Sequence, residues 1–264
     1  MKRYGVRLRE SHISVWVRGL HSPYNGTRIP SINLLKPSKE LAYIVGVVAG
    51  DGYVRRSQSL RRYYSYYVGL EARDREFVEE FSRCLAVVLN RPAPKPRPKR
   101  SEGRFVVELK CKALYEPLRK PFDMEKIRRF TEHNVECKSA FLRGFFDSEG
   151  SVAKTGDITV YNTDISLLGY AKQLLESLSI KTTGPDFYGR RGVFKNPKGR
   201  TYRTTKDIYY LYVPSDFRLK FYQRIGFTIK RKQQRLEDYL IRAGRLKPPA
   251  KPPLFFPNYI MTSY

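Results

Sequence analysis

Two acidic residues, Asp51 and Glu149, occupy equivalent places in two similar stretches of the chain. Asp51 ends the apolar, glycine-spaced run LAYIVGVVAGDG, and Glu149 ends the run SAFLRGFFDSEG 98 positions later. Two carboxylates brought together would repel one another unless cations bridged them, and hard divalent ions such as Mg²⁺ prefer oxygen ligands. A pair of such ions can hold the attacking and leaving oxygens of a phosphodiester displacement. The two acids therefore indicate metal-dependent phosphodiester chemistry.

The residues before each acid indicate how the two acids come together. Small residues recur every four positions: Ala42, Gly46 and Gly50 in the first run, and Ala140, Gly144 and Ser148 in the second. Positions four apart share one face of a helix, and helices approach closely only where the contacting residues are small. We therefore expect two helices packed through these stripes, with the two carboxylates side by side at their ends.

The elements that follow each run repeat in the same order. Residues 53–72 predict a Tyr-rich β-hairpin, 74–90 an amphipathic helix, 104–111 a strand and 114–130 a helical segment. Residues 157–162 predict a strand, 164–180 a helix, 188–213 a long basic hairpin and 231–244 a helix. The predicted fold class is α+β, a pseudo-dimer of two αββαββα units with the motif helices at the centre.

The same patterns divide the chain into four segments. Residues 1–37 form a basic extension, 38–130 the first repeat, 131–246 the second repeat and 247–264 a proline- and aromatic-rich tail. The proline-basic stretch RPAPKPRPKR within the first repeat predicts a semi-rigid loop.

The composition favours a nucleic-acid partner. The 264 residues carry 51 Lys and Arg against 25 Asp and Glu, a formal net charge of +26. Such an excess repels itself in a compact fold and is typical of proteins that bind polyanions. The start of the chain lacks the apolar core of a signal peptide, and no apolar run reaches the roughly 20 residues of a membrane span, so we expect no membrane partner.

Cysteine and histidine are too sparse for other common chemistries. The chain has three cysteines and three histidines, all widely spaced. Neither a disulfide framework nor a zinc site is expected, and a reducing, intracellular compartment is favoured. Catalysis therefore depends on carboxylates, lysines, tyrosines or bound metal.

The paired motifs resemble those of the two-repeat, single-chain LAGLIDADG homing endonucleases. The matching stretches are IVGVVAGDG over 44–52 and LRGFFDSEG over 142–150, and the resemblance extends over about residues 38–242. It implies a site-specific endonuclease that hydrolyses both strands of a long, asymmetric DNA target. It also implies curved sheets that form a DNA-binding saddle, a monomer that needs no protein partner, and an intron-encoded protein in an archaeal cytoplasm or inside an organelle.

The resemblance also implies roles for particular residues. Asp51 and Glu149 bind two or three divalent ions, Mg²⁺ with Mn²⁺ or Ca²⁺ as structural substitutes, and Gly50 and Ser148 lie beside them as further metal contacts. The family's basic residue before the C-terminal helix, which organises the water, matches Lys230. Asn162 matches the polar strand-end position of the second repeat. The first repeat departs from both patterns, because Glu136 stands at the lysine position with Lys138 two residues on, and Ala72 stands at the strand end. We therefore expect unequal cleavage of the two strands.

Basic and aromatic residues in the predicted strands and loops are the candidates for reading DNA. Arginine can bond guanine bidentately in the major groove, while lysine and loop arginine more often hold phosphates. The candidates are Arg55, Arg56, Arg61, Arg62, Tyr64 and Tyr66 in the first repeat, and Arg190, Arg191, Lys195, Lys198, Arg200, Arg203 and Lys206 in the second.

Three alternative functions predict different features of the sequence. An intron maturase on the same scaffold would bind its host intron RNA, and the intact acid pair argues against a maturase without nuclease activity. A DNA-binding regulator without catalysis would be favoured by loss of either acid, yet both are present. A tyrosine recombinase needs an Arg- and His-rich constellation around a nucleophilic Tyr, which three scattered histidines do not supply.

Overall fold

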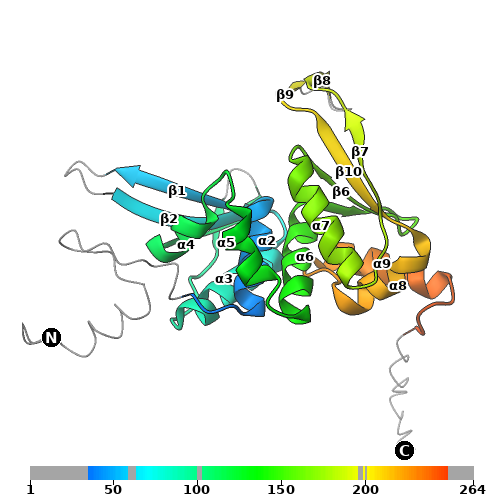
Figure 1. Ribbon diagram of the computed structural model, residues 1–264, viewed down its shortest axis with the longest axis horizontal. Coiled ribbons are helices and arrows are strands. Elements are labelled where there is room, and N and C mark those ends of the chain that lie inside the picture. The colour runs from blue at the N-terminus through cyan, green and yellow to red at the C-terminus, as the bar shows by residue number, and fades with distance from the viewer. Residues whose placement is uncertain (1–34, 59–63, 100–102, 196–198, 200, 249–264) are drawn as a thin grey trace, which may run out of the picture.

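The computed structural model describes residues 35–58, 64–99, 103–195, 199 and 201–248 (Figure 1). Most of the proposed N-terminal extension and nearly all of the C-terminal tail lie outside these ranges. Among the described helices, none is both long enough and apolar enough to cross a membrane.

The first half of the described chain contains one four-stranded antiparallel sheet and its helices. Its elements are α2 (Lys39–Ala49), β1 (Tyr53–Gln58), β2 (Tyr64–Ala72), α3 (Arg75–Leu89), β3 (Arg97–Lys99), β4 (Arg104–Lys110), α4 (Lys112–Leu118) and α5 (Met124–Thr131). The strand order is β1-β2-β4-β3. Ser38 begins α2, because its hydroxyl accepts a hydrogen bond from the Leu41 N–H at 3.1 Å and so caps the first turn.

The second half repeats this arrangement and adds a two-stranded hairpin. Its elements are α6 (Val135–Glu149), β5 (Gly150–Val152), β6 (Ile158–Asn162), α7 (Ile165–Ser177), β7 (Thr183–Gly189), β8 (Gly192–Lys195), β9 (Thr201–Thr204), β10 (Ile208–Val213), α8 (Ser215–Arg224) and α9 (Lys230–Arg242). The main sheet has the order β5-β6-β10-β7, and β8 pairs with β9. Figure 1 shows the β8–β9 hairpin projecting above the body of the protein.

Helices α2 and α6 pack together at the centre through their small residues, as the four-residue spacing predicts (Figure 1). A Cβ added at Gly46 would overlap the carbonyl oxygen of Phe141 on α6. A Cβ added at Gly144 would lie 2.5 Å from the carbonyl oxygen of Tyr43 on α2. Backbone therefore contacts backbone at both glycines, and no larger side chain fits between the helices.

Each main sheet has one face against its helices and one open face. In the second sheet, Val160 and Leu211 point to the helices and are fully buried, whereas the alternate residues Tyr161 and Tyr210 point the other way. The α+β pseudo-dimer is confirmed.

The structure differs from expectation in the segment that closes the first half. Instead of one helical segment over 114–130, helices α4 and α5 are separated by an irregular segment that contains Lys120 and Pro121. Proline disfavours helical backbone at the residue before it, so the helix ends there. This interruption also places Lys120 beside the acid pair.

Candidate catalytic site between the two halves

The two acids meet where the central helices end. Asp51 follows α2, and Glu149 is the last residue of α6. Burial, and after it the negative charge of Asp51, raise the pKa of Glu149 to about 7 against the opposing charges of Lys120 and Lys232. Burial also raises the pKa of Asp51, with Lys232, Lys120 and Arg104 opposing it. The two carboxylates and their lysines thus form one electrostatic cluster.

Lys232 is the buried lysine of this cluster. It lies on the first turn of α9, is 4% exposed, and donates hydrogen bonds to the carbonyl oxygens of Phe146 at 3.0 Å and Asp147 at 2.5 Å. Burial lowers the pKa of Lys232 to about 8, although Asp147 and Asp51 favour its charged form. An amine with this pKa can take up and release a proton near neutral pH.

Lys120 occupies the related position in the first half. Its ammonium group donates to the carbonyl oxygen of Gly50 at 3.4 Å. Burial lowers the pKa of Lys120 as well, against the charges of Glu149 and Asp51, which raise it. Unlike Lys232, its side chain is solvent-exposed at this contact.

The two lysines cross between the halves. Lys120 belongs to the first half and lines a groove with Glu149 and Asn162 of the second. Lys232 belongs to the second half and lines a smaller groove with Asp51 and Ala72 of the first. Each groove therefore contains the acid of one half and the lysine of the other.

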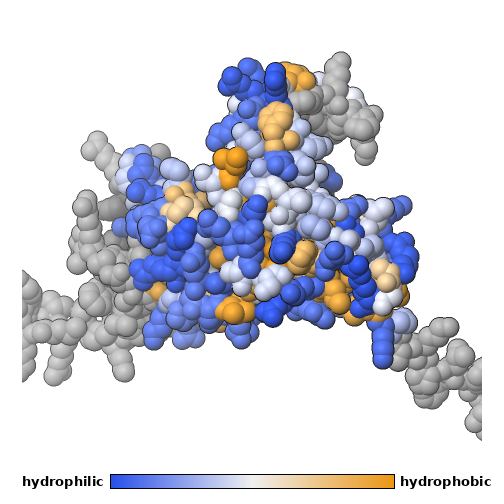
Figure 2. Space-filling model, turned by 45° about the vertical axis from the view of Figure 1, so that its right-hand side comes forward, coloured by the Kyte–Doolittle hydropathy of each residue, from blue (hydrophilic) through white to orange (hydrophobic). Residues whose placement is uncertain are grey.

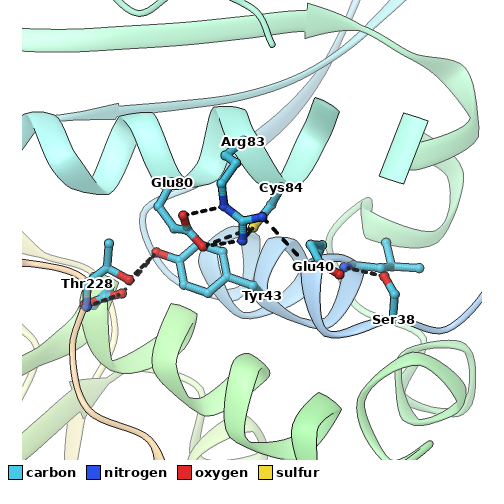
Figure 3. Close-up of polar contacts among 9 residues, drawn as sticks. Ser38, Glu40, Tyr43, Glu80, Arg83, Cys84 and Thr228 are labelled. Atoms are coloured by element: carbon cyan, nitrogen blue, oxygen red, sulfur yellow. Dashed lines mark hydrogen bonds and ion pairs between the residues drawn. The ribbon is translucent and has the colours of Figure 1, made fainter. Parts of the chain in front are cut away.

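A buried carboxylate, Asp147, fixes the segment that leads to Lys232. Its oxygens accept hydrogen bonds from the Thr228 N–H at 2.9 Å, the Ile229 N–H at 3.3 Å and the Tyr43 hydroxyl at 3.0 Å. Figure 3 shows Tyr43 reaching from α2 towards Thr228, and the two hydroxyls lie 3.2 Å apart. Burial raises the pKa of Asp147 to about 6 against the hydrogen bond from Thr228.

Ion pairs between the halves hold α9 in the same place. The Arg231 guanidinium donates to both carboxylate oxygens of Asp74 at 2.8 and 2.9 Å, and the Lys230 N–H donates to Glu76 at 3.0 Å. Asp74 and Glu76 stand at the start of α3, so the first half fixes the angle at which α9 begins.

The site has the donor chemistry expected for a hard divalent cation. Burial raises the pKa of both carboxylates, the charge of Asp51 also raises that of Glu149, and a cation between them would offset both effects. Within the described part of the chain, no three His, Cys, Asp or Glu side chains gather into a closed metal site. Two carboxylates with adjacent backbone carbonyls suit Mg²⁺, which keeps several waters and also binds phosphate oxygens.

Two lysines expected at the site lie elsewhere. Lys230 is exposed at the start of α9 and contacts Glu76 through its backbone, and the lysine that enters the site is Lys232, two residues further along. Lys138 lies near the beginning of α6, where its ammonium group donates to Ser177 at 3.3 Å, more than two helical turns from Glu149. The stretch NVECKS is therefore the start of the second motif helix, capped by Asn134, and does not precede a C-terminal helix.

The other expected site residues lie at the acid pair. Asn162 ends β6 and faces the groove of Glu149, with its side-chain oxygen accepting from the Asp164 N–H at 2.8 Å. A Cβ at Gly50 would overlap the side chain of Ser148, so these two residues touch where the helices end. The Ser148 hydroxyl donates to the carbonyl oxygen of Gly144 at 3.0 Å.

The expected DNA contacts of the first half divide between the two faces of its sheet. Arg55 lies on the open face, where its guanidinium donates to both oxygens of Glu108 at 2.6 Å. Arg56, Tyr64 and Tyr66 lie on the other face, because side chains alternate along a strand. The Tyr66 ring packs 4.7 Å from that of Tyr115 on α4. These three residues are therefore not readers on the open face, and Arg61 and Arg62 lie outside the described residues.

The expected DNA contacts of the second half surround its sheet. Arg190 and Arg191 lie between β7 and β8, Arg203 is exposed on β9, and Lys206 lines the groove of Glu149. Lys195 is the last residue of β8, and Lys198 and Arg200 lie outside the described residues.

Three residues at the site were missed by the sequence reasoning: Lys120, Lys232 and Arg104. The order of elements contained a signal for the lysines, since each lies after the strand and short helix that close a repeat. Arg104 begins β4 and lines the groove of Asp51, a placement that requires the register of the sheet.

Comparisons with known proteins agree with this architecture. Residues 136–226 match the family model of the LAGLIDADG-like domain. An uncharacterized protein of Methanocaldococcus jannaschii is 32% identical over 239 residues, which cover 89% of this chain and 83% of that protein.

Solved structures share the fold at low sequence identity. The structure of I-DmoI in complex with DNA and Ca matches with a TM-score of 0.54 and 18% identity, over 76% of this chain and 97% of that one. The structure of I-DmoI in complex with DNA and Mn matches with a TM-score of 0.51 and 19% identity, over 71% and 96% of the two chains. From its paired motifs, its fold and these relatives, the chain belongs to the LAGLIDADG family.

Proposed function

We propose that this protein is a homing-type endonuclease that hydrolyses both strands of a specific double-stranded DNA site with the help of divalent metal ions. The observation that carries the proposal is the cluster of Asp51 and Glu149 with a lysine from each half beside it. A DNA-binding regulator on this scaffold would need neither the acid pair nor a buried lysine that titrates near neutral pH. The DNA- and metal-bound structures of I-DmoI support the same partner and the same class of ion.

Asp51 and Glu149 would hold the metal, together with adjoining backbone carbonyls at Gly50 and Ser148. A bound divalent ion supplies Lewis-acid stabilisation of the negative charge that develops on phosphate oxygens. Lys232 and Lys120 would hold water in the two grooves, and Lys232, whose pKa burial lowers to about 8, can exchange protons with it near neutral pH. Asn162 orients water in the groove of Glu149, and Ala72 cannot do so in the groove of Asp51.

The open faces of the two sheets would hold the DNA across the acid pair. Arg55, Arg104 and Lys110 lie on the open face of the first sheet, and the second half adds Arg203 on β9 and the turn residues Arg190 and Lys206. Because the two halves differ in these residues, we expect a long asymmetric target. Because both acids are in one chain, we expect a monomer to cut it.

A plasmid library that carries random duplex inserts tests the proposal. We expect Mg²⁺-dependent double-strand cuts at one class of insert, no cuts in EDTA, and a loss of at least about 1,000-fold in Asp51→Asn, since several kcal/mol of charge stabilisation are removed. Asp238→Asn is the matched control, because this acid is exposed on α9 and accepts a hydrogen bond from Gln234 on the same helix. Tight binding of the library or of intron RNA without cuts would overturn the proposal in favour of a regulator or a maturase.

A further inference from the structure

The two main sheets carry opposite kinds of side chains. The strands of the first sheet contain six basic residues: Arg55, Arg56, Arg97, Lys99, Arg104 and Lys110. The strands of the second sheet, β5, β6, β7 and β10, contain neither Lys nor Arg among their residues. The cations of the second half instead lie outside this sheet, on its helices, in the turns beside the sheet and on the β8–β9 hairpin.

Tyrosines cover the open face of the second sheet. The ring of Tyr161 lies 4.8 Å from that of Tyr188 and 6.3 Å from that of Tyr210, and the last two rings are 6.2 Å apart. These three residues form what we name the tyrosine cluster. Tyr188 is 62% exposed, although an aromatic ring of this size is usually largely buried. In Figure 2 the projection formed by this half carries a few other residues that are hydrophobic, within a surface that is mostly hydrophilic.

The tyrosine cluster is continuous with the candidate catalytic groove. Tyr161 lines that groove together with Glu149 and Lys120. Lys206 lines the same groove, and Arg190 and Arg203 lie beyond it. DNA bound across the acid pair would therefore place phosphates on the basic edge and base edges over the rings.

The chemistry of this surface suits one base in particular. Guanine is read by the bidentate donors of Arg or Lys, which the strands of this sheet lack. Thymine presents a methyl group in the major groove, which apolar surfaces contact, and a nearby O4 acceptor.

We propose that the tyrosine cluster selects thymine, so that the half-site under the second sheet is specified through thymine methyl groups, while the first sheet reads its half-site through charged donors. The inference rests on the proposed function, because it names how one half of the DNA target is chosen. Rings stacked edge to face lose little freedom on binding, which suits them to a fixed array of methyl contacts.

Uracil substitution tests this inference, since it removes the methyl group and leaves every hydrogen-bonding atom of the base pair in place. A bound sequence is first selected from random duplex DNA with the full-length protein in Ca²⁺. Thymines are then replaced by uracil in one half-site at a time, and affinity is measured. We expect a loss of about fourfold per contacted methyl in one half-site and none in the other.

Protein variants assign the effect to the cluster. Tyr188→Ala should lower affinity for the thymine duplex and remove the difference in affinity between thymine and uracil duplexes. Tyr188→Leu should retain part of that difference. Tyr64→Ala is the matched control, because Tyr64 is also exposed but lies on the helix side of the first sheet. A selected site that tolerates uracil everywhere, or a uracil effect unchanged in Tyr188→Ala, would overturn the inference and leave the endonuclease proposal standing. Failure to select any sequence would overturn both.

Discussion

The grooves beside Asp51 and Glu149 have equivalent positions in the two halves but are lined by different side chains. Beside Asp51 lie the buried Lys232 and the apolar strand end Ala72. Beside Glu149 lie the more exposed Lys120 and the polar strand end Asn162. The two grooves share the backbone contacts and small residues of the central helices, and they differ in the lysine and the strand-end residue beside each acid. The comparison indicates that packing is shared between the halves while chemistry is divided between them.

The largest expected effect tests the shared packing. Gly46→Leu and Gly144→Leu should each lower the free energy of unfolding by more than about 4 kcal/mol, because backbone of the facing helix occupies the space. Gly169→Leu on α7 is the control, since no atom lies within 4 Å of a Cβ there. Circular dichroism during thermal melting would measure all three. Normal folding of Gly46→Leu or of Gly144→Leu would contradict the proposal that the two helices pack through equivalent close contacts.

The next effect concerns the two lysines. Lys232→Met should slow one strand cut about 100-fold, as expected for loss of a positioned proton-transfer group. Lys120→Met should slow the other strand cut less, because its ammonium group is more solvated and water can replace part of its function. Nicked and linear plasmid, resolved with one strand labelled at a time, would measure the two rates. Equal loss on the same strand in both variants would show that the lysines do not serve separate grooves.

A smaller effect is expected at the strand ends. Asn162→Ala should slow cutting on its own strand about tenfold, and Ala72→Asn should speed the other strand by less than that, since only the orientation of water changes. The ratio of the two strand rates is the informative measurement, because it cancels differences in DNA affinity. A ratio unchanged in both variants would contradict the assignment of Asn162 to the groove of Glu149.

The smallest effect is on stability and depends on pH. The pKa of Glu149 is raised from an ordinary 4.5 to about 7, so the folded protein takes up a proton more readily than the unfolded chain. The charged carboxylate therefore destabilises the metal-free fold above about pH 7, and this cost disappears as pH falls towards 4.5. Glu149→Gln should melt a few degrees higher than wild type in EDTA at pH 8 and show little difference at pH 5. A difference that does not change with pH would argue against burial of this carboxylate.

Much of the fold could be predicted from residue types and spacing. The stripes of small residues identified the central helix pair, and alternating residues identified the strands, because these periodicities reflect packing that is local in sequence. The prediction of one long helical segment over 114–130 was wrong, because Pro121 disfavours helical backbone at the residue before it.

The acids of the site were predictable from the motifs, whereas the lysines had a signal only in the order of the elements, and the face of the sheet on which each strand residue lies had none. Asp51 and Glu149 end the motif runs themselves, so their meeting follows from the helix pair. Lys232 and Lys120 reach the acids only through folding of the opposite half, which no spacing within one repeat reveals. The face on which Arg55 and Arg56 lie depends on a register that a shift of one residue would reverse.

The crossing of the lysines has a consequence for exchange of parts between related proteins. A first half transferred onto a foreign second half would carry its own proposed DNA contacts and its own acid, but its lysine would line the groove that contains the acid of the host. At each cut site of such a hybrid, one parent would therefore supply the DNA contacts and the acid, and the other parent would supply the lysine. Such a chimera can bind a mixed target well and still fail to cut one of its strands. Restoring that cut would require changes in the half that was not exchanged.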